Sequence, residues 1–400
     1  MRNLTTRKAV VCTTAWLACC ALLFFGERVH LFPADKLVPT KLFHNLTGSP
    51  NCSFEHWVEI KVGANDKFAL VAEDVCNYLT TTVVGFSSMN PVLQRLQILS
   101  LIRQKFANVW RTFWKRELAS TTVLVVIATK DRPALLHLVL EHLFACTSST
   151  KVIVLYEASE QTHANAYQRV FIDFPLVTAW DRTQNGGYFS SLLKVAQQQV
   201  TNVVVCSDDT VFIRNVDLKV HGLTQRLLAG TGFRVTTQFR ISYPLPSNSP
   251  PILAHVVIEN LPDLYLTDCT RDNTPHLCYD RHIDGPLYLR SHLLAEWPSL
   301  PNPDHPGEFE GRWIGAKLSY DVLDFTLFPA EQVLFNAGGS QSTVRAENFV
   351  ASSQEKNAAD RVRSSAKVLD GCKLFLMDND VQSNHDTHRS STFGWKCPTS

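Results

Sequence analysis

Residues 122–133 read TVLVVIATKDRP and decide the fold. The apolar, β-branched run 122–128 is typical of a parallel strand that is covered on both faces. The polar turn then leads into a helical pattern over 134–144. The chain repeats this alternation, with strands predicted at 151–156, 177–180 and 202–206 and helices predicted at 164–171 and 188–199. Strands that alternate with helices predict an α/β domain with a mostly parallel sheet.

Ligands of such sheets bind beyond the carboxyl ends of the strands, so polar residues at those ends are the candidates for a site. Ser207-Asp208-Asp209 follows the strand 202–206 directly. Two adjacent carboxylates repel each other unless a cation neutralises them. Mg²⁺ or Mn²⁺ does this by binding one or two carboxylates together with substrate phosphates. The alternative is that an aspartate here only caps a helix.

The order of these motifs resembles the nucleotide-sugar-binding half of GT-A fold glycosyltransferases, in particular the family-2 and exostosin-like enzymes. The resemblance covers about residues 120–215. The turn TKDRP is similar to the turn after the first strand of those enzymes, and Ser207-Asp208-Asp209 is similar to their DxD-type metal motif. The resemblance implies a GT-A (Rossmann-like) sheet flanked by helices, a nucleotide-diphosphate sugar donor such as a UDP-sugar, and Mn²⁺ or Mg²⁺ as cofactor.

The resemblance also implies roles for individual residues. Asp209 would bind the metal, Asp208 would face the sugar or ribose, and Glu157 would contact the uracil or ribose. The remaining contacts to the nucleotide would come from Thr129, Asp131, Arg132, Asn185 and Gly186. Each of these could instead be an ordinary turn residue. Ser207 departs from the pattern, because a hydroxyl stands where the motif has its first acid, and this weakens the expectation of metal dependence.

The carboxyl half offers candidates for the chemistry at the acceptor. The segment 282–288, which contains Asp284, resembles the strand that re-enters beside the metal. Glu308 and Glu310 precede a helical stretch, where inverting enzymes carry the general base, and we favour Glu310. Two solvated acids at a helix start are the alternative. His385 or the nearby His388 would reach the metal or the diphosphate, unless this polar segment is only a tail.

The amino end predicts a membrane anchor. Residues 9–25 are apolar and uncharged, and the basic residues within 1–8 predict a cytoplasmic amino end, as in a single-pass type II protein. A cleaved signal peptide is the alternative. The short span favours a Golgi or endoplasmic reticulum membrane. We then expect a luminal stem over 26–118 and a catalytic domain over 119–400, with a nucleotide-sugar half (119–215) and an acceptor half (216–400).

A luminal chain can carry glycans and disulfides. Asn45 and Asn51 begin acceptor sequons in the predicted stem. Candidate disulfide pairs are Cys269 with Cys278, Cys52 with Cys76, and Cys372 with Cys397, whereas Cys206 is expected to be a buried thiol. Residues 91–118 predict one basic amphipathic helix. It either lies on an anionic membrane surface or, as we favour, packs on the domain that follows.

The composition argues against a nucleic-acid partner and excludes little else. Lys and Arg number 38 against 37 Asp and Glu, so the basic excess of a nucleic-acid binder is missing. We therefore expect a glycosyltransferase that acts on a glycan or glycoprotein acceptor in the secretory pathway. The alternatives are a catalytically silent module that binds a glycan or nucleotide or supports a partner enzyme, and, less favoured, a nucleotidyltransferase.

Overall fold

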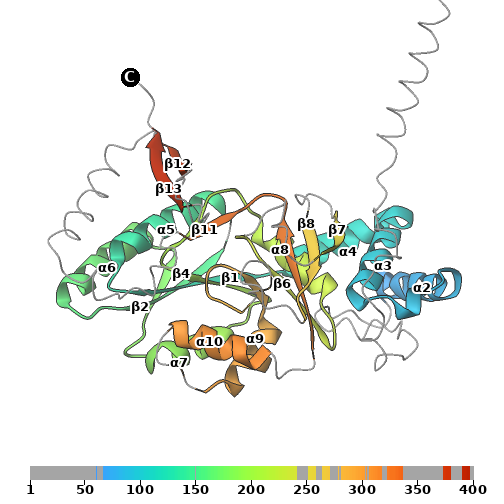
Figure 1. Cartoon of the computed structure of the whole chain (residues 1–400), viewed down its shortest axis with the longest axis horizontal. Helices are drawn as coiled ribbons and strands as arrows, with labels where there is room; N and C mark the ends of the chain where they lie inside the picture. Colours follow the sequence, from blue (N-terminus) through green and yellow to red (C-terminus); the bar gives the residue numbers. More distant parts are fainter. Residues whose placement is uncertain are drawn as a thin grey trace, which may run out of the picture.

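The computed structural model of the chain (Figure 1) describes residue 60 and residues 66–148, 150–240, 251–257, 264–270, 278, 281–301, 303, 306–317, 322–336, 373–379 and 390–396. Its centre is a nine-stranded sheet in the order β3-β2-β1-β4-β9-β6-β10-β8-β7. The strands are β1 (Val123–Lys130), β2 (Lys151–Glu157), β3 (Val177–Asp181), β4 (Asn202–Ser207), β6 (Phe233–Thr237), β7 (Ile252–Val256), β8 (Leu264–Asp268), β9 (Leu287–Leu289) and β10 (Leu323–Pro329).

The first four strands of the chain confirm the predicted α/β alternation. β1 pairs in parallel with β2 on one side and with β4 on the other, and β3 extends the sheet beyond β2. The intervening helices are α5 (Pro133–Cys146), α6 (Gln161–Asp173) and α7 (Gly187–Ala196). All seven of these elements lie where the sequence predicts them, to within three residues at each end.

Helices cover both faces of this half of the sheet. Figure 1 shows α5 and α6 on one face, and α7, α9 (Arg290–Glu296) and α10 (Pro306–Lys317) on the other. Successive side chains of β1 point to opposite faces of the sheet and so pack against both helical layers. Val125 joins the core under α5, and Val126 joins the core under α7. A strand buried on both faces must be apolar throughout, which explains the continuous run that identifies it.

The second half of the sheet is mixed. The resemblance implied a strand re-entering near 282–288, but the sequence did not predict the directions of these strands. β9 runs antiparallel to both β4 and β6, whereas β10 is parallel to β6 and antiparallel to β8. β6 therefore points the same way as β4. The chain just before β9 lies at the edge where β1, β4 and β6 end. This reversal places acceptor-half residues beside the end of β4.

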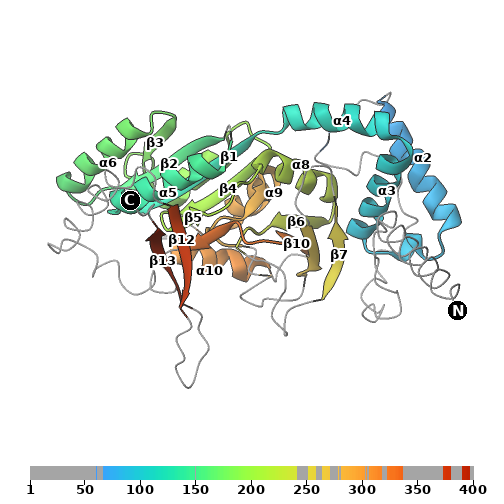
Figure 2. The same ribbon diagram turned by 90° about the horizontal axis from the view of Figure 1, so that it is seen from above.

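The predicted helix over 91–118 is wrong in one respect, because it is two helices. α3 (Pro91–Lys105) ends at Phe106, and α4 (Ala107–Ser120) begins there in a new direction. Figure 2 shows α4 running along one side of the molecule toward β1, while α3 packs beside α2 (Lys67–Thr82). The break leaves Phe106 41% exposed, although its spacing from Leu99 and Phe113 would place it on the apolar face of a single helix.

These helices pack on the domain that follows, as we favoured. They share one apolar core with α8 (Leu218–Leu228), β6, β7, β8 and β10. Arg95 is buried in this core and donates to the carbonyl oxygen of Leu227 at 3.3 Å. Arg226 of α8 reaches Glu117 of α4 at 3.4 Å. Residues 66–120 therefore have no core separate from that of the sheet.

Further short elements complete the described structure. They are the 3-10 turns η4 (Phe86–Ser88) and η5 (Trp297–Ser299), the pair β5 (Thr210–Phe212) and β11 (Leu334–Asn336), and the pair β12 (Lys373–Asn379) and β13 (Ser390–Lys396). The Cys269–Cys278 disulfide is confirmed, Cys76 is also in a disulfide, and Cys206 is a buried free thiol.

Several predictions fall on parts of the chain that are not described. They are the anchor at 9–25, the sequons at Asn45 and Asn51, Cys52 of the candidate pair Cys52–Cys76, the pair Cys372–Cys397, and the candidates His385 and His388. Within the part of the chain that is described, no helix is both long enough and apolar enough to cross a membrane.

Candidate active site

The end of β4 and the start of β9 bring three polar side chains together. The Gly285 backbone N–H donates to the carbonyl oxygen of Val205 at 2.7 Å, which extends the β4–β9 pairing to the sheet edge. The Ser207 hydroxyl lies within hydrogen-bonding distance of Asp209 and, at 3.0 Å, of Asp284. One hydroxyl hydrogen can serve only one carboxylate at a time. The two carboxylates therefore share a single donor from Ser207.

Gly285 allows the segment before β9 to pass close to β11. Its φ of +94° lies in the left-handed region that side-chain-bearing residues rarely adopt. A Cβ atom at this position would stand 2.1 Å from Leu334 Cδ1. The residue after Asp284 must therefore be glycine for the loop to sit against β11, and this fixes where the Asp284 carboxylate lies.

Asp208 faces the nucleotide half of the sheet. Thr129 donates to one of its carboxylate oxygens at 2.8 Å, and Arg132 pairs with the other at 3.2 Å. Burial raises the pKa of Asp208 to about 6, although Arg132 opposes the rise. Tyr167 on α6 stabilises the turn after β1. Its hydroxyl contacts Thr129 at 2.8 Å and accepts from the Arg132 backbone N–H at 3.0 Å.

Asp131 is held by the protein itself. It has a φ of 55°, and its carboxylate accepts from the backbone N–H and the hydroxyl of Ser159, each at 2.7 Å. His163 Nδ1 lies 3.2 Å from the same carboxylate. These contacts fasten the turn after β1 to the start of α6. The predicted nucleoside contact of Asp131 would have to share a carboxylate that already has three neighbours.

Glu157 ends β2 between two cations. Lys130 lies 2.6 Å from one carboxylate oxygen, and Arg182 lies 2.9 Å from the other. Arg182 follows β3 directly and also stands over the ring of Tyr188, 5.5 Å from its centroid. The polar ends of β1, β2 and β3 are thus joined into one surface beside Asp208.

The Asn185-Gly186-Gly187 turn starts α7. Gly186 and Gly187 have φ values of +83° and +90°, which explains why glycine occupies both positions. The Asn185 amide donates to the carbonyl oxygen of Asp181 at 2.7 Å, and Lys194 donates back to Asn185. The backbone N–H groups of a helix start favour an anion such as a diphosphate.

The two acids of α10 have different surroundings. Glu308 forms an ion pair with Arg312 one turn later. Glu310 accepts from the Ile283 backbone N–H at 2.8 Å, which brings it beside Asp284. Burial, assisted by the charge of Asp284, raises the pKa of Glu310 to about 7. Only Glu310 therefore belongs to the acid cluster.

His282, Asp284 and Glu310 each offer a ligand atom, and these atoms lie within 4.8 Å of one another. Both nitrogens of His282 are already occupied, because Nδ1 accepts from the Asp284 N–H at 3.0 Å and Nε2 meets Gln238 Oε1 at 3.1 Å. This pairing assigns the proton to Nε2 and makes His282 a positioning residue. Arg240, which follows β6, pairs with Asp284 at 2.7 Å.

The charge balance of the cluster fits a divalent cation. Among the described residues, Arg132 pairs with Asp208 and Arg240 pairs with Asp284, and no ion pair to Asp209 or Glu310 is present. Burial raises the pKa of Asp209 also, and Asp284 adds to the rise. Asp209, Asp284 and Glu310 thus set three carboxylates against the single cation Arg240. Such an excess of carboxylates is the donor set that Mn²⁺ or Mg²⁺ binds. Asp209 would hold the ion, with Asp284 as the second carboxylate within reach.

Arg182, Arg240, Tyr167 and Tyr188 were missed by the sequence analysis. Arg182 follows β3 and Arg240 follows β6, so the rule that picks polar residues at strand ends would have found both. Tyr167 and Tyr188 lie within the helices α6 and α7, and no local pattern marks them as parts of a site.

Comparisons with known proteins give structural likeness only. No family model and no curated protein matches the sequence. One similar solved structure is glucosyl-3-phosphoglycerate synthase from Mycobacterium tuberculosis, solved with Mn²⁺, UDP and phosphoglyceric acid (14% identity over 66% of this chain and 85% of that chain, TM-score 0.33). Another is mannosyltransferase PcManGT from Pyrobaculum calidifontis, solved with GDP-Man and Mn²⁺ (12% identity over 74% and 87%, TM-score 0.36). S. aureus TarS is a third (12% identity over 61% and 42%, TM-score 0.35). Because these TM-scores are low, the functional argument rests on the geometry of this chain.

Proposed function

We propose that the chain is a GT-A type glycosyltransferase that moves a sugar from a nucleotide-diphosphate donor to a hydroxyl of a glycan or glycoprotein. The observation that carries the proposal is that Glu310 of the acceptor half lies beside Asp284, which shares the Ser207 hydroxyl with Asp209 at the end of β4. This brings a base and an acidic cation site together at the switch point of an α/β sheet, where ligands of such sheets bind.

The donor would lie across the ends of β1 to β4. The nucleoside would contact the Glu157–Arg182 surface and Thr129, and the diphosphate would reach the start of α7 at Gly187. Asp208, fixed by Thr129 and Arg132, would orient the ribose or the sugar. A UDP-sugar remains the donor to test first.

Glu310 would act as the general base of an inverting displacement. It accepts the proton of the acceptor hydroxyl while that oxygen bonds to the anomeric carbon and the bond to the diphosphate oxygen breaks. A base works best when its pKa lies near the working pH, and a pKa of about 7 meets that condition. A divalent ion, when bound, would supply charge stabilisation for the leaving diphosphate. The Ile283 N–H holds the Glu310 carboxylate in place.

The compartment is part of the proposal. The Cys269–Cys278 disulfide and the disulfide of Cys76 favour an oxidising environment. Together with the predicted span at 9–25, they support a single-pass type II protein of the Golgi or endoplasmic reticulum whose catalytic domain is luminal.

A second candidate function is a catalytically silent module that binds a sugar nucleotide or glycan. Ser207 favours it, because a hydroxyl replaces the first acid of the metal motif and bridges Asp209 and Asp284. Such a module would bind the donor without transferring or hydrolysing it.

One experiment separates the two functions. A panel of sugar nucleotides with Mn²⁺ is screened by thermal shift, and the best ligand is assayed for hydrolysis and transfer. We expect Glu310→Gln to lower turnover by about 10²–10⁴-fold while the thermal shift stays. Glu308→Gln is the matched control and should keep most of the activity, because Glu308 pairs with Arg312 and is not among the grouped side chains His282, Asp284 and Glu310. Binding without turnover in the unmodified protein would favour the silent module. Binding of no sugar nucleotide would refute the transferase and, of the silent module, would leave only the glycan-binding form.

A further inference from the structure

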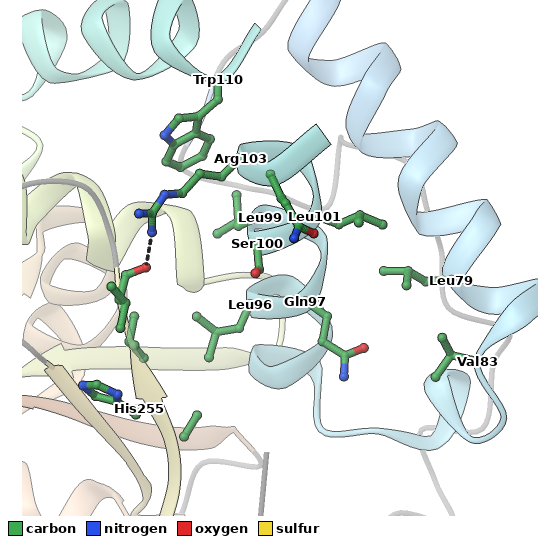
Figure 3. Close-up of a pocket in the computed structure, with 14 residues that line it drawn as sticks. Leu79, Val83, Leu96, Gln97, Leu99, Ser100, Leu101, Arg103, Trp110 and His255 are labelled. Carbon is green, nitrogen blue, oxygen red and sulfur yellow. Dashed lines mark hydrogen bonds between the residues drawn. The ribbon is translucent and has the colours of Figure 1, made fainter. Parts of the chain in front are cut away.

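A cavity lies between α2, α3 and the edge strand β7, as Figure 3 shows. Its described lining is mostly aliphatic, and Arg103 is the only lysine or arginine in that lining. The Arg103 guanidinium already donates to the carbonyl oxygen of Val257 at 2.9 Å. Neither the shape nor the charge of this cavity therefore identifies an occupant.

The segment that carries Asp284 is fixed in detail, because four successive backbone N–H groups have four different acceptors. For residues 282 to 285, in chain order, these acceptors are the Tyr288 hydroxyl (3.1 Å), Glu310 Oε1 (2.8 Å), His282 Nδ1 (3.0 Å) and the Val205 carbonyl oxygen (2.7 Å). A buried N–H group that loses its acceptor is costly. Each of the four acceptors therefore helps to fix the position of the Asp284 carboxylate.

The third of these bonds restricts where His282 carries its proton. Nδ1 can accept from the Asp284 N–H only through a lone pair, so the proton of the neutral ring must be on Nε2. Nε2 lies 3.1 Å from Gln238 Oε1, an oxygen that can only accept. The two contacts agree with each other. A ring with its proton on Nδ1 would instead set two N–H groups against each other.

Gln238 can select this tautomer because its own position is fixed. It is buried, it follows β6 directly, and its backbone N–H donates to the carbonyl oxygen of Leu327 in β10 at 2.7 Å. Arg240, two residues further along the chain, pairs with Asp284 at 2.7 Å. The chain after β6 therefore holds the segment before β9 at two points, His282 and Asp284.

We propose that Gln238 is a positioning residue of the candidate active site. It holds His282 as the Nε2–H tautomer, and the ring in turn fixes the backbone of Asp284, whose carboxylate lies beside the Ser207 hydroxyl. A hydrogen bond to one ring nitrogen commonly decides the tautomer and the role of the other. The consequence for a cation at Asp284 rests on the proposed function, whereas the tautomer and the position of the segment do not.

The first measurement uses the full, unmodified chain with ¹⁵N-labelled histidine. Long-range ¹H–¹⁵N NMR spectra distinguish a protonated ring nitrogen from an unprotonated one, and His282→Asn identifies the signals of His282 by their loss. We expect Nε2 to be protonated and Nδ1 to be unprotonated. Any other state of the ring, including exchange between the two tautomers, would overturn the proposal.

The second measurement removes the acceptor at a similar side-chain volume. In Gln238→Met the His282 ring should populate both tautomers, and hydrogen exchange of the amides of 282–286, followed by mass spectrometry, should be roughly tenfold faster. Exchange of the β4 amides in the same samples is the reference for global unfolding. Thermal melting confirms that each variant is folded.

Gln225→Met is the matched control. Gln225 is also a buried glutamine next to β6 and β9, but its amide bonds to Asn202, Val235 and Leu287. Its replacement should lower stability and leave the His282 ring as the Nε2–H tautomer. An equal effect of Gln225→Met on that tautomer would show that Gln238 acts only through packing and would overturn the proposal.

His282→Asn separates the tautomer from the packing of the ring. The amide oxygen of asparagine accepts from the N–H group two residues on, as in an Asx-turn, and it has no tautomer to be set. Exchange of 282–286 should therefore stay within about a few-fold of the parent, and Gln238→Met should add little in this background. An effect of Gln238→Met of the same size in both backgrounds would contradict the proposed role.

Titration with Mn²⁺ alone tests the consequence for the cation site. The affinity of Gln238→Met for Mn²⁺ should be roughly tenfold weaker than that of the parent, and an unchanged affinity would overturn the link between Gln238 and the cation site. If the unmodified protein binds no Mn²⁺, the cation site of the proposed function fails, and the tautomer and exchange results still decide the role of Gln238.

Discussion

The position of Asp284 depends on a glycine, and this dependence can be measured. Gly285 combines a φ of +94° with a Cβ position 2.1 Å from Leu334 Cδ1 and 3.1 Å from Thr210 Cγ2. A side chain in the left-handed region costs about 1–2 kcal/mol. Overpacking a core adds about 1–3 kcal/mol. We therefore expect Gly285→Ala to lower the free energy of unfolding by about 2–5 kcal/mol.

Two other glycines separate the two contributions. Gly232 has a φ of +80° with no atom within 4 Å of the added Cβ, so Gly232→Ala should cost about 1–2 kcal/mol through the backbone alone. Gly311 lies within α10, has no positive φ and also has no atom within 4 Å. Gly311→Ala should raise stability by about 0.5–1 kcal/mol, because alanine is the better helix former.

A double-mutant cycle with Leu334 isolates the clash. Leu334→Ala alone should cost about 2–5 kcal/mol, because the side chain is fully buried. In the double variant the alanine Cβ at position 285 has room, so the combined loss should be smaller than the sum of the two by about 1–3 kcal/mol. Urea denaturation followed by tryptophan fluorescence measures the free energy of unfolding of all variants. The slope of that free energy against urea concentration should be the same in each. Additive losses, or a Gly285→Ala variant as stable as the parent, would refute the reasoning.

Two further predictions concern pH and the disulfide. Without metal, Asp208 keeps its proton to about pH 6 when folded but loses it near pH 4 when unfolded, so its contribution to stability should fall as the pH rises from about 4 to 6. Asp208→Asn should remove that slope in urea titrations with a chelator, and an unchanged slope would contradict the assignment. Replacing Cys269 and Cys278 together by serine should cost about 2–3 kcal/mol, because the bridge closes a loop with a sequence separation of 9. Urea denaturation under non-reducing conditions measures the loss, since reduction would also open the disulfide of Cys76. A double-serine variant as stable as the parent argues against the prediction.

Much of the nucleotide half could be predicted because its signals are local. The apolar runs at β1, β2 and β4 follow from burial on both faces, and the polar turns after them mark the sheet edge. The helix break at Phe106 could not be predicted in this way. The apolar period continues through that residue, and the change of direction comes from packing α3 and α4 on α8 and β7.

The sequence by itself determined the α/β alternation and the edge of the sheet where Asp208 and Asp209 stand, and it made Cys269–Cys278 a candidate disulfide. Each of these depends on residues close together in the chain. The resemblance led us to expect Asp284 beside the metal and Glu310 as the base, but only the tertiary structure shows the contacts that bring them together, and that both nitrogens of His282 have partners. The physical reason is the direction of β9. An antiparallel strand between β4 and β6 carries the segment 282–286 to the edge where the parallel strands end, and no local pattern encodes a pairing between residues this far apart.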